Sequence, residues 1–172
     1  MMTMSSAANA DVMINLNSGP VVSSGNFKWT YTVTLKSGST LNNGDLFTIY
    51  DIGGFGVQDP IPLNVVLPAG SNWSYSIAFK GTDGFFQAPV DSNIVYNVTY
   101  RYIGASPIVA SVDTVLGGDA GAFGYTSSHN TSFTGAYSAT SHVTAGGAPA
   151  GNSSAVTVAG GPYDAIFRDS FD

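Results

Sequence analysis

Residues 27–36, FKWTYTVTLK, alternate strictly between apolar and polar side chains. In an extended chain the five apolar residues share one face, and the three threonines and two lysines share the other. Such alternation is typical of a β-strand that has one buried and one solvated face. The stretch therefore predicts a strand whose core-facing residues are Phe27, Trp29, Tyr31, Val33 and Leu35.

The same period of two recurs in residues 73–80, WSYSIAFK, and 94–103, IVYNVTYRYI. The predicted apolar faces of these two strands carry Trp73, Tyr75, Ile77 and Phe79, and then Ile94, Tyr96, Val98, Tyr100 and Tyr102. Weaker strands are predicted at 12–16, 46–50, 61–67, 107–116, 122–127, 131–143 and 154–159. Residues 117–153 are rich in small residues, and they fit either small-residue strands or a long surface excursion.

These segments predict about ten short strands, separated by turn signals such as SGST, LNNGD and LGGDAG. No segment has a convincing helical period. The pattern favours an all-β fold, an antiparallel two-sheet β-sandwich of immunoglobulin-like or jelly-roll-like type. A ligand-filled barrel is the alternative, but the one-sided apolar faces suit a sandwich better.

The composition narrows the classes of partner. All eleven acidic residues are Asp, only five residues are Lys or Arg, and the net charge is −6. Scattered lysines on an acidic chain cannot neutralise a row of phosphates, so nucleic acid and anionic membranes are poor partners. No apolar run approaches the roughly 18 residues of a membrane span, so no membrane insertion is expected. The chain has no Cys, which excludes disulfides and thiol chemistry.

The chain divides into three expected parts. Residues 1–10 include Ala8-Asn9-Ala10, a small-x-small pattern of the kind that precedes a signal-peptidase cut, although a basic region and an apolar region are missing. This part is either the remnant of an export signal or a flexible N-terminus. Residues 11–160 form the β-sandwich domain. Residues 161–172 form a C-terminal tail.

Residues 44–60, GDLFTIYDIGGFGVQDP, contain a glycine cluster that could be mistaken for a phosphate or calcium loop. The cluster lacks the Lys-Ser/Thr of a phosphate-binding loop, and position 59 is Asp where a dinucleotide turn has its third glycine. The calcium nonapeptide would place its acid one position earlier and would repeat. The stretch is therefore interpreted as a strand that runs into a glycine turn.

Chemistry-bearing residues are sparse, and we expect no enzyme and no cofactor. Asp51 with Asp59, and Asp113 with Asp119, are weak candidates for calcium ligands from converging loops, although each is also an ordinary turn acid. His129 and His142 are interpreted as exposed loop residues, and no G-x-S-x-G elbow is present.

Trp29, Trp73 and most tyrosines fall on predicted core faces. Three phenylalanines lie instead in turn-like segments: Phe55, Phe85 and Phe86. They either fold back as loop plugs or form an exposed contact patch.

The order of these segments carries a resemblance. The sequence resembles exported bacterial proteins of the PEP-CTERM type in its YTYTVTL-like strand, LNNGDLFTIYDIGGF, WSYS and VYNVTYRYIG, over roughly residues 14–160. The resemblance implies a sandwich domain sent to the cell envelope or matrix. The chain lacks the Pro-Glu-Pro and membrane-helix ending of that group. Its ending instead resembles a short Ile-Phe-x-x-x-Phe-acid motif of secreted gammaproteobacterial proteins, which implies a sorting role for Ile166, Phe167, Arg168, Asp169 and Phe171.

These observations predict a non-catalytic, extracellular or cell-surface structural protein of a matrix, surface layer or filament. Its expected partner is itself or other surface components, through strand complementation at open sheet edges. The expected donated segments are DVMINLN, SAVTVAG and AIFRDSF, residues 11–17, 154–160 and 165–171. The alternatives are a carbohydrate- or surface-binding module, with the three phenylalanines as contacts, and a hydrolase whose site the sequence does not reveal.

Overall fold

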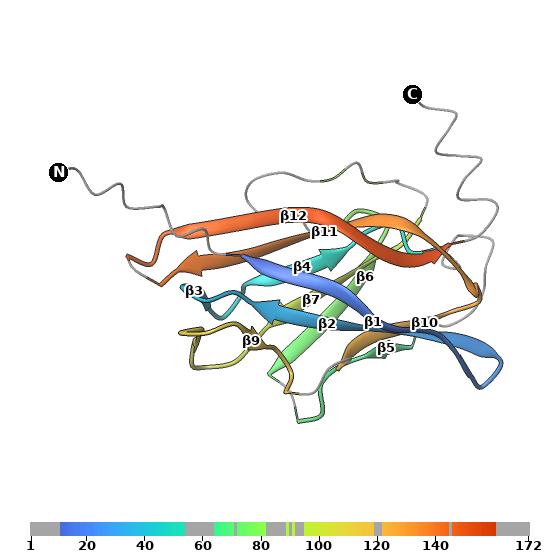
Figure 1. Ribbon diagram of the computed structural model, residues 1–172, viewed down its shortest axis with the longest axis horizontal. Helices are drawn as coiled ribbons and strands as arrows, with labels where there is room; N and C mark the ends of the chain where they lie inside the picture. The colour runs from blue at the N-terminus through green and yellow to red at the C-terminus, as the bar shows by residue number, and fades with distance from the viewer. Residues whose placement is uncertain are drawn as a thin grey trace.

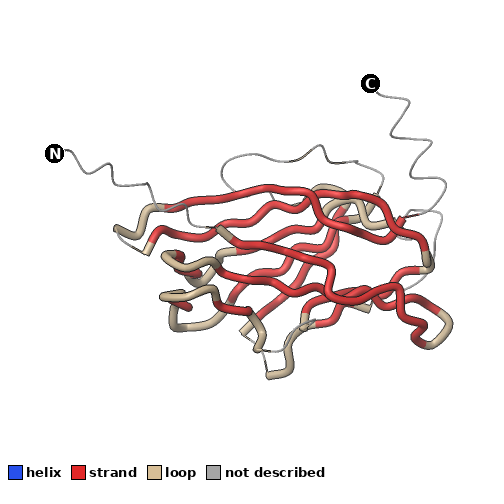
Figure 2. Tube along the Cα trace, viewed as in Figure 1, coloured by secondary structure: helices blue, strands red, loops and turns tan. Residues whose placement is uncertain are grey.

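The computed structural model describes residues 11–53, 64–70, 72–81, 89, 91, 95–118, 122–144 and 146–160. These residues form two antiparallel sheets and include no helix (Figures 1 and 2). The predicted two-sheet β-sandwich is therefore confirmed. The twelve strands are β1 (Val12–Ser23), β2 (Asn26–Leu35), β3 (Ser39–Leu41), β4 (Leu46–Ile49), β5 (Val65–Val66), β6 (Trp73–Ala78), β7 (Asn97–Tyr102), β8 (Ile108–Val109), β9 (Thr114–Val115), β10 (Phe123–Ser127), β11 (Thr131–Val143) and β12 (Pro149–Gly160).

The first sheet has the strand order β1-β2-β10-β5, and β9 pairs with the end of β2. The second sheet has the order β6-β7-β4-β11-β3-β8, and β12 pairs with β11 along the whole of its length. Among the described strands, β1 and β12 each have a ladder partner on one side only. Each of them is therefore an edge strand of its sheet.

The inner face of β2 forms the centre of the core, as its alternation predicts for four of the five apolar residues; Phe27 is only half-buried, and Thr30 of the opposite face is buried. Trp29, Tyr31, Val33 and Leu35 are all fully buried, whereas Thr32 between them is half-buried. On the facing sheet, Phe47 of β4 stacks on Tyr100 of the neighbouring strand β7, with ring centroids 4.7 Å apart. Aromatic side chains from both sheets thus fill the space between them.

A second aromatic contact joins the two sheets directly. Phe123 of β10 meets Phe47, Trp73 and Tyr100 of the second sheet edge-on, with ring centroids 5.0 to 5.4 Å apart. These distances lie in the range at which aromatic pairs stabilise beyond their buried area. The assignment of Trp29, Trp73 and most tyrosines to the core is confirmed.

Several predicted boundaries and faces were wrong. Residues 39–41 lie in a predicted turn but form β3, and the predicted strand at 107–116 is two short strands. Tyr75 was assigned to the core but is 47% exposed, because β6 is an edge strand and only Trp73 at its start is buried. The β1 strand continues well past its predicted end at 16, through two register shifts, to a hairpin turn at Ser24 and Gly25.

The small-residue stretch within 117–153 forms much of the longest hairpin of the fold. β11 and β12 pair from Thr131 and Gly160 to His142 and Pro149. At Gly135 a Cβ atom would lie 2.7 Å from a methyl group of Val158, so only glycine fits there without a shift. The strand interpretation of this stretch is therefore correct, and the surface-excursion interpretation is wrong.

Candidate functional site

The first calcium candidate, Asp51, lies just after β4 in the left-handed region of backbone conformation, with φ of 52°. It is buried, and its backbone N–H donates a hydrogen bond to Asn97 Oδ1 at 2.6 Å. Its proposed partner, Asp59, lies outside the described residues. Asp51 therefore occupies a turn that is tied to β7.

The second calcium candidate, Asp113, is an exposed residue between β8 and β9. It forms an ion pair with Lys36 and accepts a hydrogen bond from the Ser37 N–H at 2.9 Å. The Lys36 ammonium group holds the pKa of this carboxyl below its usual range. Asp119 lies outside the described residues. Within the described part of the chain, no three His, Cys, Asp or Glu side chains are grouped so that they could hold a metal ion.

The predicted contact patch of Phe55, Phe85 and Phe86 lies outside the described residues. The predicted sorting motif lies outside them as well: Ile166, Phe167, Arg168, Asp169 and Phe171.

The histidine prediction was wrong for His142, which lies on β11 instead of in a loop. Its Nδ1 atom is 3.0 Å from Oδ2 of the buried Asp45, and the same carboxylate oxygen accepts a hydrogen bond from Asn42 N–H at 2.6 Å. An Asp–His pair is the orienting part of a catalytic triad. The contact between Asp45 and His142 ties the β3–β4 turn to β11.

His129 lies in the connection between β10 and β11, as predicted, but it is half-buried instead of exposed. Its backbone carbonyl accepts a hydrogen bond from the Trp29 indole at 3.3 Å, and its N–H donates one to Ser127 Oγ at 3.0 Å.

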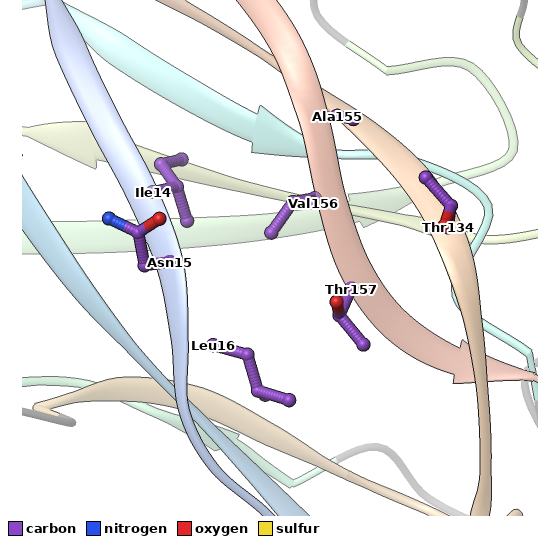
Figure 3. A pocket seen from close by; sticks show the side chains of 7 residues that line it. All are labelled: Ile14, Asn15, Leu16, Thr134, Ala155, Val156 and Thr157. Atoms are coloured by element: carbon purple, nitrogen blue, oxygen red, sulfur yellow. The ribbon is translucent and has the colours of Figure 1, made fainter.

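The groove between β1 and β12 is the candidate binding site of this fold. These two edge strands belong to different sheets but lie side by side and run in the same direction (Figure 1). A cavity of about 170 Å³ opens between them. In Figure 3, Ile14, Leu16 and Val156 reach into the gap. The residues that line this groove, which we call the seam, are Ile14, Asn15, Leu16, Thr134, Ala155, Val156 and Thr157.

One end of the seam is closed by a side-chain amide. Asn152 Oδ1 of β12 accepts a hydrogen bond from the Val12 N–H at 3.0 Å, and its Nδ2 donates one to the Val12 carbonyl at 2.8 Å. An amide that both accepts from and donates to one residue reproduces the hydrogen bonds that a neighbouring strand would make. Asn152 thus stands where the peptide group of an inserted strand would otherwise lie.

Tyrosine hydroxyl groups from the core satisfy some of the remaining edge groups. The Tyr137 hydroxyl donates to the Val12 carbonyl at 3.1 Å, and the Tyr31 hydroxyl donates to the Thr157 carbonyl at 3.0 Å. The Tyr125 hydroxyl accepts from the Ala159 N–H at 3.1 Å. Burial raises the pKa of Tyr31 and Tyr125 above its ordinary value, which keeps both hydroxyl groups protonated at neutral pH.

Between these tied ends, the strand edges keep unpaired backbone groups. Backbone groups alternate sides along a strand, and those of Val12 point toward β12, so those of Leu16 do so too. By the same alternation Ala155 points toward β1, because the Thr157 carbonyl does. Within the described part of the chain, neither Leu16 nor Ala155 has a ladder partner on the seam side.

The seam therefore leaves two edge positions, Leu16 and Ala155, open to a further hydrogen-bonding partner. The apolar side chains of Ile14 and Val156 are buried at its floor, whereas the polar Asn15, Thr134 and Thr157 are exposed at its rim together with the small Ala155. The segments DVMINLN and SAVTVAG were expected to be donated to a neighbour. The structure instead pairs them within the chain, with β2 and with β11, so that they form the two walls of the seam.

The fold and this site define an antiparallel two-sheet β-sandwich with an open seam between two edge strands. Comparison with protein-family models, with curated proteins and with solved structures finds no match to this chain. The described residues contain no helix of the length and apolar character that a membrane span requires.

Proposed function

We propose that this chain is a non-catalytic structural protein, secreted or held at the cell surface, whose copies assemble by strand complementation at the seam. The observation that carries the proposal is the pair of parallel edge strands, β1 and β12, which flank an apolar-floored groove with unpaired backbone groups on both walls. Unpaired strand edges are templates for pairing with another chain. Backbone hydrogen bonds provide the affinity in such complexes, and pockets for alternate side chains provide the specificity.

The composition supports an assembling surface protein over a binder of charged ligands. Only 9% of the residues are charged, and the five Lys and Arg residues are scattered along the chain. A surface of hydroxyl and amide groups opposes the approach of a second copy less than a highly charged surface would. The resemblance to exported envelope and matrix proteins points the same way, toward an extracellular matrix, surface layer or filament.

Light scattering and electron microscopy over a range of protein concentrations test the proposal. Oligomers or filaments whose size grows with concentration are expected. Ala155→Pro removes the N–H that faces the seam and leaves the β11 ladder intact, because proline is tolerated where an edge N–H points outward. This variant is expected to remain monomeric.

The matched control is Val109→Pro on β8, which is another edge of the second sheet. Val109 is exposed, and its neighbour Ala110 bonds to the start of β3 and to the residue before it: its N–H donates to the Ser39 carbonyl and its carbonyl accepts from the Gly38 N–H. Proline at Val109 therefore also removes only an outward N–H. The control should assemble like the parent chain. A parent chain that stays monomeric at every concentration would contradict the proposed function.

A further inference from the structure

We propose that the β6 edge of the second sheet pairs with β6 of a second copy of this chain, antiparallel and about a two-fold axis at Tyr75. This contact is separate from the seam and does not depend on the proposed function. It joins the second sheets of two copies into one continuous sheet.

The β6 edge lacks the usual protection against pairing. β6 pairs with β7 from Trp73 to Ala78 without a register shift, and among the described strands it has no partner on its other side. Natural edge strands are protected by short length, charged side chains, proline or bulges. Residues 73–78, WSYSIA, contain no charged residue and no proline.

The other described edges are protected by such features. β5, β8 and β9 contain two residues each. β1 carries Pro20 and two register shifts. The β12 edge is bonded in part to the hydroxyl groups of Tyr31 and Tyr125. A second copy therefore meets the least resistance at β6.

The backbone groups of β6 that face away from β7 can be assigned from one ladder bond. The Ile103 N–H donates to the Asn72 carbonyl at 2.8 Å, so the backbone of Asn72 faces β7. Backbone groups alternate sides along a strand, so every second residue after Asn72 faces β7 as well. The N–H and C=O groups of Trp73, Tyr75 and Ile77 therefore face the outer side of the edge.

The ladder partner of Trp73 agrees with this assignment. The Tyr102 N–H donates to the Asp45 carbonyl at 2.8 Å, and the Tyr102 carbonyl accepts from the Gly44 N–H at 2.9 Å. Tyr102 thus directs both backbone groups away from β6, although it lies opposite Trp73 in the register. Trp73 and Tyr102 form a pair without hydrogen bonds, as the alternation requires.

A two-fold axis at Tyr75 pairs all three outward-facing residues at once. Tyr75 then lies opposite Tyr75 of the second copy, and Trp73 of each copy lies opposite Ile77 of the other. Opposed residues of this kind exchange both of their hydrogen bonds, so the three pairs form about six. A shift of the register in either direction leaves one of the three residues without a β6 partner.

The side chains of this edge suit an identical neighbour. Trp73, Tyr75 and Ile77 share the face that turns toward the core, where Trp73 is buried, Ile77 is half-buried and Tyr75 is 47% exposed. The pairing lays one Tyr75 ring beside the other, and aromatic cross-strand pairs stabilise sheets. Because residues 73–78 carry no charge, no like charges are placed opposite each other.

The contact is small, so two free copies pair only briefly. Six residues on each side compare with the roughly 20–30 residues a side of a stable interface. In an assembly many weak contacts act together. There the β6 pairing connects neighbouring chains side by side.

Disulfide trapping captures such a brief pair, and the chain contains no cysteine of its own. Tyr75→Cys places a thiol at the two-fold axis, where opposed Cα atoms are about 5.5 Å apart, within disulfide range. The matched control is Ala78→Cys, which is also at an exposed position of β6. The pairing separates the two Ala78 positions by about six residues along the strands, or roughly 20 Å.

Both variants are made in the full-length chain that carries Ala155→Pro, so that the seam does not bring copies together. The expected result under mild oxidation is a covalent dimer in Tyr75→Cys and its loss in Ala78→Cys. Equal dimer formation in the two variants, or no dimer in Tyr75→Cys, would overturn the inference. Failure of the proposed function shows separately, as a parent chain that stays monomeric in light scattering, and it leaves the outcome of the trapping unchanged.

Discussion

The hydroxyl oxygens of Tyr31 and Tyr125 lie 2.7 Å apart in the core, with ring centroids 5.7 Å apart. Both rings come from the first sheet, and both hydroxyl groups are hydrogen-bonded to the backbone of β12 in the second sheet. The Tyr31 hydroxyl donates to the Thr157 carbonyl, and the Tyr125 hydroxyl accepts from the Ala159 N–H. The pair therefore connects the two sheets by hydrogen bonds at the floor of the seam. A connection of this kind fixes the position of the β12 edge without a ladder partner.

Removal of one hydroxyl should loosen this connection. Tyr31→Phe removes the donor to the Thr157 carbonyl and the acceptor of the Tyr125 hydroxyl, which costs about 1–3 kcal/mol of the free energy of unfolding. Urea denaturation measures the loss. Tyr75→Phe is the matched control, because Tyr75 is largely exposed, and it should change stability much less. Equal losses in the two variants would contradict the connecting role.

Alkaline pH should destabilise the fold. Burial raises the pKa of Tyr31, Tyr100 and Tyr125 in the folded chain, whereas unfolded tyrosines ionise near pH 10. The stabilisation is thus fully present below about pH 10 and is lost as the pH rises toward the folded-state pKa values. Each such tyrosine costs about 1.4 kcal/mol per pH unit in that window.

Urea denaturation at a series of pH values, together with tyrosinate absorbance, checks this pH dependence. The buried tyrosines should ionise only as the chain unfolds. An unfolding free energy that stays level from pH 9 to pH 12 would show that these hydroxyl groups are not held protonated by the fold.

The Asn152 amide should be essential to the closed end of the seam. Asn152→Asp keeps an acceptor for the Val12 N–H but replaces the donor to the Val12 carbonyl with a second acceptor. The expected loss is about 1–3 kcal/mol at neutral pH, with faster hydrogen exchange at the Val12 amide. The neighbouring Ser153→Ala, at an exposed position of β12, should leave both unchanged. Unaltered exchange at Val12 in the Asp variant would show that the amide does not hold this end.

Gly124 should not tolerate even an added methyl group. General propensity favours Ala over Gly inside a strand, but a Cβ at Gly124 would lie 2.3 Å from the backbone oxygen of Trp29 on the neighbouring strand. Because that atom belongs to the backbone of the central strand, it cannot simply rotate away. Gly124→Ala is expected to cost about 3 kcal/mol or more. Thermal or urea unfolding measures the cost, and a stability equal to that of the parent chain would refute the contact.

Local pattern predicted much of this fold, and the reasons are visible in particular strands. From Tyr31 to Leu35 the β2 strand is half-buried on one face and fully buried on the other, so its alternation in sequence reports its faces directly. β11 has neighbours on both sides and is buried on both faces over Ser138 to Ser141. Alternation is lost in such a strand, and small residues such as Gly135 are required by close packing, so the sequence resembles a loop.

The seam could not be predicted from local pattern. It arises where edge strands of two different sheets meet, and β1 and β12 are separated by most of the chain. In the sequence Asn152 resembles any other turn-forming residue. Only its hydrogen bonds to Val12 in the structure show that it closes one end of the seam. Local pattern also failed at Tyr75. Its place in an alternating stretch predicts that it is buried, but it is exposed because β6 lies at the edge of the second sheet.

Hydrogen exchange at the seam as a function of protein concentration tests the central claim most directly. If copies pair at the seam, the amides of Leu16 and Ala155 should become protected as concentration rises. The outward-facing amide of Val109, on the β8 edge, should exchange at the same rate throughout. Rapid, concentration-independent exchange at Leu16 and Ala155 in a sample that light scattering shows to be assembled would contradict the seam as the site of pairing.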